Sequence, residues 1–226
     1  MQNIPLEARP REKLLSQGAH ALSDAELLSL LLRTGISGCN VLSLSQMLLN
    51  RCGGLSGLLH APSEELSAIK GLGGPAKRAQ LLAVMELARR GMGEQLRKRQ
   101  ALNHPTLVRE YLQMQLGHKA HECFGVLFLD SQHQLLEFEV MFRGTLNQTS
   151  VYPREVALRA LHHHAASVVL SHNHPSGHTQ PSAADVQLTR QLIQALGLLE
   201  IRVLDHVIVT QGRSLSMAEE GLMPAA

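Results

Sequence analysis

A short segment of the chain gathers residue types that bind metal ions. The chain has 226 residues and 13 histidines, two of which form the pattern His172-x-His174-Pro175. Six residues later come Ser182 and then, after two more, Asp185. Two imidazoles and a carboxylate at these spacings can hold one metal ion, and a metal with three protein ligands keeps one coordination position open for chemistry. The pattern therefore predicts a metal site with His172, His174 and Asp185 as ligands.

The flanking segments indicate how these side chains could meet. Residues 166–171 are apolar and β-branched, which predicts a buried strand. Side chains two apart on a strand share a face, so His172 and His174 can aim at one point. Ser182 fits a helix N-cap, with Asp185 in the capping-box position. A loop that returns to the strand end would bring Asp185 to the imidazoles.

The donor set suits zinc. Nitrogen and carboxylate donors without thiolates favour zinc, although iron, manganese and cobalt are compatible with them. A simpler interpretation is also open, because a His-x-His pair alone is more often incidental and Ser182 and Asp185 could form only a helix cap. The two interpretations are compatible, since a cap and a ligand can be neighbours.

The complete pattern, from His172 to Asp185, resembles the signature of the JAMM (JAB1/MPN) metalloproteases. The resemblance implies an MPN fold (cytidine-deaminase-like), in which a sheet flanked by helices binds one zinc ion through the two His and the Asp. It also implies that Ser182 assists at the metal-bound oxygen, and that a Glu on an early strand is the general acid/base through the zinc-bound water. The implied activity is that of a zinc metallopeptidase, which hydrolyses a peptide or isopeptide bond.

The position of this Glu must be found separately. Glu122 opens an apolar strand and is the first candidate; it would take a proton from water and pass one to the leaving amine. Glu155 is the second candidate, although it falls in a first helical turn, where an acid stabilises the helix dipole. Glu137 and Glu139 alternate with apolar residues, which is typical of the solvated face of an antiparallel strand.

Other histidines have structural interpretations. His162–His164 lie on a predicted helix over Glu155–Ala165 and fan out around its axis, so they cannot chelate one metal together. His178 could touch substrate or a group behind the ligands, but the family pattern gives it no role. His206, flanked by strand residues, is interpreted as a satisfied core or strand-end histidine. Two polar segments could line a substrate cleft: Arg143–Thr145 and Ser150–Arg154.

Composition divides the chain into two domains. Residues 1–100 carry 13 Lys/Arg and 8 Asp/Glu, a net charge of +5, and are Leu-rich with helical spacing. Residues 101–226 carry 8 and 11, a net of −3, and contain β-branched runs. We therefore predict an α+β (α/β-like) protein, with a helical domain ending in a basic linker (or helix end) at Gly91–Gln100 and a metal domain after it. Helices of the first domain are predicted over Ser23–Leu32, Val41–Leu49, Glu64–Lys70 and Ala76–Arg90.

The segment Gly71–Arg78 places a glycine turn between two predicted helices and resembles a helix-hairpin-helix DNA-binding element. Its glycines would let backbone N–H groups approach a phosphate, and Lys70, Lys77 and Arg78 would neutralise charge nearby. A weaker copy is present at Leu32–Asn40. Alternatively, the region is a helical bundle with a solvated basic face. With no Trp, two Tyr and four Phe, stacking on bases has little support, so any binding is expected to be non-specific and through the backbone.

Both parts together resemble the bacterial RadC (UPF0758) family. The leading hypothesis is a zinc metallopeptidase acting on a protein or peptide; the alternative is a DNA-associated protein of RadC type whose metal domain serves structure or partner recruitment. A metal-dependent nuclease is a third hypothesis, but the pattern lacks the carboxylate cluster of two-metal sites. The matching segments are Arg9–Leu15, the glycine turn, Arg143–Thr145, Val151–Glu155 and Ser171–Gly177.

The sequence also predicts a cytoplasmic location. Cys39, Cys52 and Cys123 follow neither a disulfide nor a metal-knuckle spacing, which favours reduced thiols. The N-terminus resembles no secretory signal, and no apolar run reaches the roughly 18 residues of a membrane span.

Overall fold

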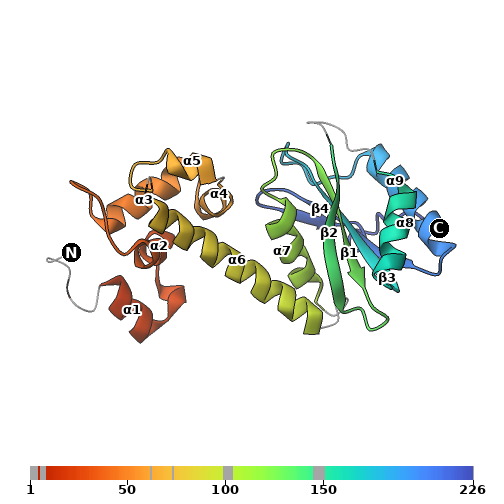
Figure 1. Ribbon diagram of the computed structural model, residues 1–226, viewed down its shortest axis with the longest axis horizontal. Helices are drawn as coiled ribbons and strands as arrows, with labels where there is room; N and C mark the ends of the chain where they lie inside the picture. The colour runs from red at the N-terminus through yellow and green to blue at the C-terminus, as the bar shows by residue number, and fades with distance from the viewer. Residues whose placement is uncertain are drawn as a thin grey trace. The chain divides into compact units, whose positions relative to one another are not determined.

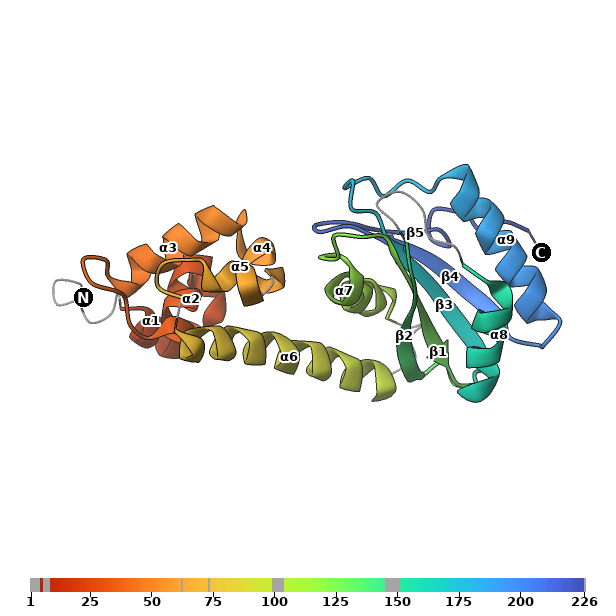
Figure 2. The ribbon, with the colours of Figure 1, turned by 45° about the horizontal axis from the view of Figure 1, so that its top comes forward.

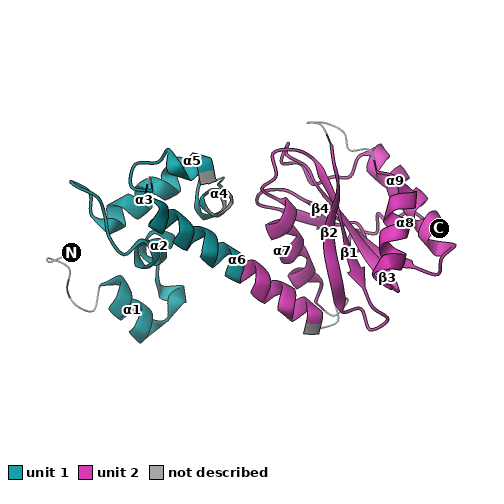
Figure 3. Cartoon of the chain, in the orientation of Figure 1, with its two compact units in different colours: residues 1–87 teal, residues 88–226 magenta. Residues whose placement is uncertain are grey.

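The computed structural model describes residues 5, 9–61, 63–72, 74–98, 104–144 and 151–225. Contacts divide the chain into two compact units, Met1–Leu87 and Ala88–Ala226 (Figure 3). The boundary falls within one long helix, α6 (Pro75–Lys98). Each unit has a core of its own, and the two are described separately.

The first unit is built from short helices around buried leucines. Its second helix begins with a capping box, in which Ser23 Oγ accepts from the Glu26 backbone N–H and the Glu26 carboxylate accepts from the Ser23 N–H. Leu44 and Leu48 are fully buried in the core. Its helical elements (Figure 1) are α1 (Pro10–Gln17), the 3₁₀ turn η2 (Ala19–Ala21), α2 (Asp24–Leu32), α3 (Val41–Cys52), α4 (Leu55–His60), α5 (Ser63–Ser67) and the start of α6.

The predicted succession of helix, glycine turn and helix is present between α5 and α6. Gly71 has φ +103°, a backbone conformation that favours glycine, and a Cβ there would also displace the Leu44 side chain, whose Cδ1 would lie 2.8 Å away. α5 is a single turn that ends at Ser67, earlier than the predicted Lys70. Gly73, in the middle of the predicted turn, lies outside the described residues.

α6 continues through the segment assigned to a linker or helix end. Leu96 is 1% exposed in the core of the second unit, and Arg97 Nη1 donates to the carbonyl of Leu136 at 2.8 Å. These contacts hold residues 91–98 helical; residues 99–100 lie outside the described range. Among the helices that are described, none combines the length and apolar character needed to cross a membrane.

The second unit is a five-stranded mixed sheet with the strand order β2-β1-β3-β4-β5. Among the described strands, β3 and β4 pair in parallel, and the other pairs are antiparallel. Helix α7 lies on one face, and α8 and α9 lie on the other (Figure 2). The predicted fold class, a helical region followed by a sheet flanked by helices, is confirmed. The elements are α7 (Pro105–Leu116), β1 (Cys123–Leu129), β2 (Leu135–Arg143), α8 (Pro153–His162), β3 (Ser167–Asn173), α9 (Ala183–Gly197), β4 (Arg202–Val209) and β5 (Ser214–Ser216).

The two central strands are buried on both faces. Every residue of β1 and of β3 is buried. On β1, Cys123 and Leu127 enter the core beneath α7, whereas Phe124 and Val126 enter the core beneath α8 and α9. Strands covered on both sides carry continuous apolar runs, which explains why the run before His172 reads as a strand without alternation.

The crossover from β3 through α9 to β4 determines where a site can form. In this parallel β3–α9–β4 unit, the chain leaves the carboxyl end of β3 and enters α9. Binding sites of α/β units commonly lie at the carboxyl ends of their strands. His172 is the last residue but one of β3. Ser182 is the N-cap of α9, as predicted.

Helix α8 is shorter than predicted and ends at His162 instead of Ala165. His163 forms its C-cap, and His164 takes a left-handed conformation with φ +53°. As predicted, the three do not form one metal-binding group: the His162 ring is exposed and packs edge-on against that of His163, whereas His163 Nε2 lies 2.7 Å from Glu139 Oε1. The histidine run therefore closes the helix and belongs to no metal group among the described residues.

The prediction that Glu139 lies on a solvated face is wrong. Its side chain is 24% exposed and is held by Arg159, whose Nε donates to Oε2 at 2.7 Å, and by His163. The Arg159 hydrogen bond, supported by His163 and opposed by partial burial, lowers the pKa of Glu139 to about 2. Glu137, in contrast, makes an exposed ion pair with Arg97.

We expect Glu139→Gln to destabilise the protein at neutral pH. A lowered carboxyl pKa stabilises the fold above the ordinary value of 4.5, and this stability is lost as the pH falls toward about 2. The expected loss at pH 7 is up to about 1 kcal/mol, the upper range for partly exposed pairs. Urea unfolding of wild type and variant should show a difference that shrinks between pH 5 and pH 2. Glu137→Gln is the control, with a smaller effect; an equal loss for Glu139→Gln at every pH would contradict the assignment.

Candidate metal centre

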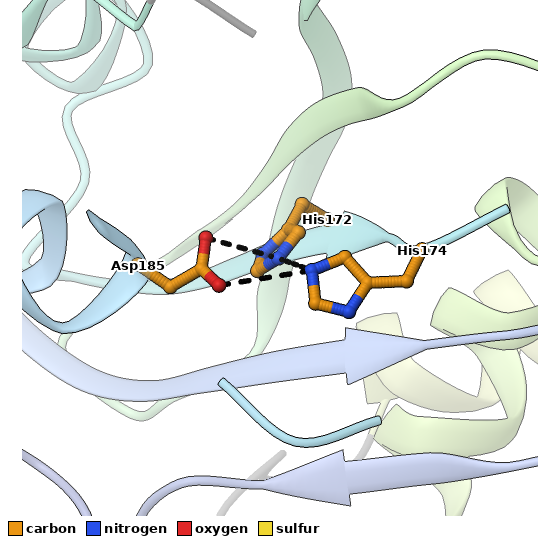
Figure 4. A group of neighbouring side chains, drawn as sticks. All are labelled: His172, His174 and Asp185. Atoms are coloured by element: carbon orange, nitrogen blue, oxygen red, sulfur yellow. Dashed lines mark hydrogen bonds and ion pairs between the residues drawn. The ribbon is translucent and has the colours of Figure 1, made fainter. Parts of the chain in front are cut away.

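The side chains of His172, His174 and Asp185 converge at the carboxyl end of β3 (Figure 4). His172 Nε2 lies 2.8 Å from His174 Nε2 and 3.3 Å from Asp185 Oδ1. His174 Nε2 lies 3.7 Å from Asp185 Oδ2. Within the described part of the chain, no other group of three His, Cys, Asp or Glu has ligand atoms this close. The structure thus brings the three predicted ligands together.

These separations fit a tetrahedral metal ion. Zinc holds nitrogen and oxygen ligands at about 2.0–2.1 Å, which places ligand atoms about 3.3 Å apart. The 3.3 Å between His172 Nε2 and Asp185 Oδ1 matches that distance, and the 2.8 Å between the two imidazole nitrogens is shorter. The 3.7 Å from His174 Nε2 ends on the other carboxylate oxygen, Oδ2. The set is two imidazoles and one carboxylate, and three donors leave a fourth position open, whereas structural zinc sites usually use four protein ligands. The residues present therefore fit a catalytic type of zinc site.

Asp185 serves both the helix and the cluster. Its Oδ2 accepts from the backbone N–H and the hydroxyl of Ser182, both at 2.7 Å, and completes the capping box of α9. Its Oδ1 faces His172. Burial alone would raise the pKa of Asp185, but hydrogen bonds from His172 and His174 outweigh it and hold the pKa well below its usual range. The carboxylate is therefore ionised and available as a ligand.

Each ligand histidine is held through its other ring nitrogen. His174 Nδ1 lies 2.7 Å from the backbone carbonyl of His178 and must donate to it, which leaves Nε2 for a metal. His172 Nδ1 lies 2.8 Å from Nε2 of the buried His206. The hydrogen bond with Asp185, aided by the His178 carbonyl and by the charge of Glu122, raises the pKa of His174 against the opposing effect of burial. His178 thus contributes its carbonyl to the site.

Glu122 directly precedes β1, and its charge acts on His174. Asn173, between the two histidines, fixes this segment: its Oδ1 accepts from Cys123 N at 2.8 Å, and its Nδ2 donates to the carbonyls of Lys119 and His121 at 3.0 and 3.1 Å. The backbone carbonyl of Glu122 also accepts from the N–H of Gly144, the residue directly after β2. The backbone that carries the predicted base is therefore tied to the strand that carries the ligands.

The rival acids have other partners. Glu155 lies in the first turn of α8, as predicted, and pairs with Arg154. Glu137 and Glu139 pair with arginines of α6 and α8. Of the four candidates, Glu122 is the one whose charge acts on His174. The role of general base stays a prediction for Glu122.

Ser182 is hydrogen-bonded to Asp185 of the cluster. The residue is exposed, and its Oγ donates to Asp185 Oδ2 at 2.7 Å. The hydroxyl is therefore at the cluster, but it would have to leave Asp185 to donate to an oxyanion. Of the segments predicted to line a cleft, Gly144 donates its N–H to the Glu122 carbonyl at 2.8 Å, whereas Thr145 and Ser150 lie outside the described residues.

Sequence reasoning missed three residues of the site. His206 was interpreted as a satisfied core histidine, which it is, but its ring also contacts the ligand His172. Thr189 Oγ1 lies 2.6 Å from His206 Nδ1, and Asn173 holds the Glu122 segment. One available signal was the position of Thr189 four residues after Asp185, on the same side of the predicted helix.

Residues 102–222 match the family described as RadC-like JAB domain, and residues 1–79 match the family described as UPF0758 N-terminal. The chain is 61% identical over 222 residues to a UPF0758 protein of Variovorax paradoxus (strain S110), covering 98% of this chain and 99% of that protein. It is 60% identical over 225 residues to a UPF0758 protein of Delftia acidovorans (strain DSM 14801 / SPH-1) and 58% identical over 237 residues to one of Acidovorax ebreus (strain TPSY), covering 99% of each chain in both cases. These names state no activity.

We expect the purified protein to bind one equivalent of Zn²⁺, and His172→Ala and Asp185→Asn to weaken binding at least about tenfold, because each removes one of three ligands. Competition with a chromogenic chelator gives the affinity, and elemental analysis gives the stoichiometry. Binding should also raise the melting temperature of wild type. His162→Ala, an exposed histidine outside the cluster, is the control. Wild-type affinity in His172→Ala would rule out this site.

Proposed function

The chain belongs to the UPF0758 family and carries a RadC-like JAB domain, as its sequence predicts, and from this premise we propose that it is a zinc-dependent hydrolase of peptide or isopeptide bonds. The observation that carries the proposal is the cluster of His172, His174 and Asp185, whose donor atoms lie within 4.8 Å of one another, so that three ligands leave one position of a tetrahedral site open. Glu122, whose charge acts on His174, is a carboxylate outside this ligand set.

The residues divide the work of hydrolysis among them. A zinc ion held here would polarise the scissile carbonyl and lower the pKa of a coordinated water from 15.7 to about 7. Glu122 takes the proton of the attacking water as the new C–O bond forms. It then delivers that proton to the leaving nitrogen as the C–N bond breaks, so that an amine and a carboxylic acid result. Ser182 Oγ turns from Asp185 Oδ2 to donate to the developing oxyanion, a role typically worth a few kcal/mol.

The donor set favours this function over its rivals. A structural zinc usually takes four protein ligands, whereas three converge here. Two-metal nucleases and phosphatases hold their ions about 3.5–4 Å apart with bridging carboxylates. Asp185 is the one carboxylate in the cluster among the described residues. A single-metal amide hydrolase therefore fits the site better than a nuclease.

Glu122→Gln is expected to retain zinc but to lose about a hundredfold to ten-thousandfold in amide hydrolysis, since it removes proton transfer and leaves the ligands intact. The substrate can be sought by comparing new peptide N-termini and freed lysine side chains after a proteome is incubated with zinc-loaded wild type or variant. Glu155→Gln is the matched control and should cleave like wild type. If Glu155→Gln lost cleavage and Glu122→Gln cleaved normally, the general base would be Glu155 of α8.

A second candidate function is sequence-independent DNA binding by the first unit. Lys70 and Gly74 are exposed beside the turn that precedes α6, where helix N–H groups favour a phosphate. Lys77 is less suited than predicted, because its Nζ donates to the carbonyls of Thr34 and Gly35 at 2.6 and 3.3 Å. We therefore assign the contact to Lys70 and the start of α6.

We expect Lys70→Gln to weaken binding to a short random-sequence duplex about threefold and to reduce the salt slope by about 1, as for one lost phosphate contact. Fluorescence anisotropy over a salt titration measures both quantities. Arg51→Gln, an exposed charge at the end of α3, is the control for net charge alone. Equal affinity and slope in wild type and Lys70→Gln would exclude the turn from DNA binding.

A further inference from the structure

His206 connects the ligand His172 to the helix that carries the ligand Asp185. It lies on β4 and is fully buried, with its ring 4.9 Å from the His172 ring. Its Nε2 is 2.8 Å from His172 Nδ1, and its Nδ1 is 2.6 Å from Thr189 Oγ1. Thr189 Oγ1 is in turn 2.6 Å from the backbone carbonyl of Asp185. A continuous chain of hydrogen bonds therefore joins the two ligands behind the site.

The direction of every bond in this chain follows from its last member. The Asp185 carbonyl can only accept, so it takes the single hydroxyl proton of Thr189. The Thr189 oxygen must then accept from His206 Nδ1–H. His206 is fully buried, and the hydrogen-bond partners of its ring among the described residues are the Thr189 hydroxyl and the His172 ring. Because no carboxylate there offsets the cost of a buried charge, the ring is neutral and its Nε2 carries a lone pair.

That lone pair has a defined consequence for the ligand. His206 Nε2 must accept from His172 Nδ1–H, so the neutral form of His172 carries its lone pair on Nε2. His172 Nε2 is the atom that faces His174 and Asp185. The other ligand, His174, is oriented in the same way through the backbone carbonyl of His178. Each imidazole is thus held through Nδ1 and directs Nε2 at the centre, one through side chains and one through the backbone.

We infer that Thr189 and His206 are positioning residues that fix the tautomer and ring orientation of His172 for metal binding. The inference rests on the proposed zinc site and adds residues that touch neither metal nor substrate. Such partners behind a ligand typically change metal affinity by about 10–100-fold. A purely structural role for His206 would require only a well-filled core, which a similar apolar side chain could supply.

Thr189→Val and Thr189→Ser separate these roles. Valine matches threonine in shape but has no oxygen to accept from His206, whereas serine keeps the hydroxyl. In the metal-free protein labelled with ¹⁵N-histidine, two-bond ¹H–¹⁵N spectra should show His172 protonated on Nδ1 in wild type and Thr189→Ser. In Thr189→Val we expect the other tautomer to appear and the Zn²⁺ dissociation constant to rise about 10–100-fold, with wild-type circular dichroism.

His206→Gln and His206→Leu provide a second pair, in case Thr189→Val does not fold. The glutamine amide oxygen can still accept from His172 Nδ1–H, so Gln should retain more Zn²⁺ affinity than Leu. The same tautomer and affinity in Thr189→Val and Thr189→Ser, or in the His206 pair, would overturn the inference. If wild type binds no Zn²⁺, the proposed function fails, but the tautomer spectra of the metal-free protein still decide whether the relay exists.

Discussion

The second unit is organised around one buried carboxylate. The side chain of Asp185 is 12% exposed, and a buried charge is costly unless it is paired and hydrogen-bonded. Its two oxygens meet this demand in different ways: Oδ2 caps α9 through Ser182, and Oδ1 faces an imidazole. The start of the helix and the composition of the site are therefore set by the same group, and a change at either would disturb both.

Strands and helix termini, which are the rigid parts of the fold, hold this carboxylate and its partners. His172 lies within β3, His206 lies on the parallel neighbour β4, and Thr189 lies on α9 about one turn after Asp185. Asn173 extends the same construction to β1 by binding the segment that carries Glu122. Sites built on such elements keep their geometry better than sites on loops, which suits a centre that must receive a metal without rearrangement.

Local spacing predicts part of this arrangement well. His172, His174, Ser182 and Asp185 lie within 14 consecutive positions, so strand parity and a capping signal are enough to place them together. His206 and the environment of Glu139 depend on which strands and helices become neighbours, and a single sequence does not specify that register. The end of α6 differs from the prediction for a related reason. Gly91 and Gly93 lower the helix propensity of this segment, but the packing of Leu96 and the contact of Arg97 with Leu136 outweigh that loss.

The two histidines of the cluster differ in solvent exposure, so the site is open on one side and closed on the other. His172 is 2% exposed and is backed by the buried His206, whereas His174 is 17% exposed and is held by a loop carbonyl. Ser182, the N-cap of α9, is exposed. Under the proposed function, a substrate would approach from the side of His174 and Ser182, because the His172 side is closed to water. The residues that fix ligand geometry would then be separate from those that meet the substrate, so that a change in the loop that holds His174 would alter specificity without loosening His172.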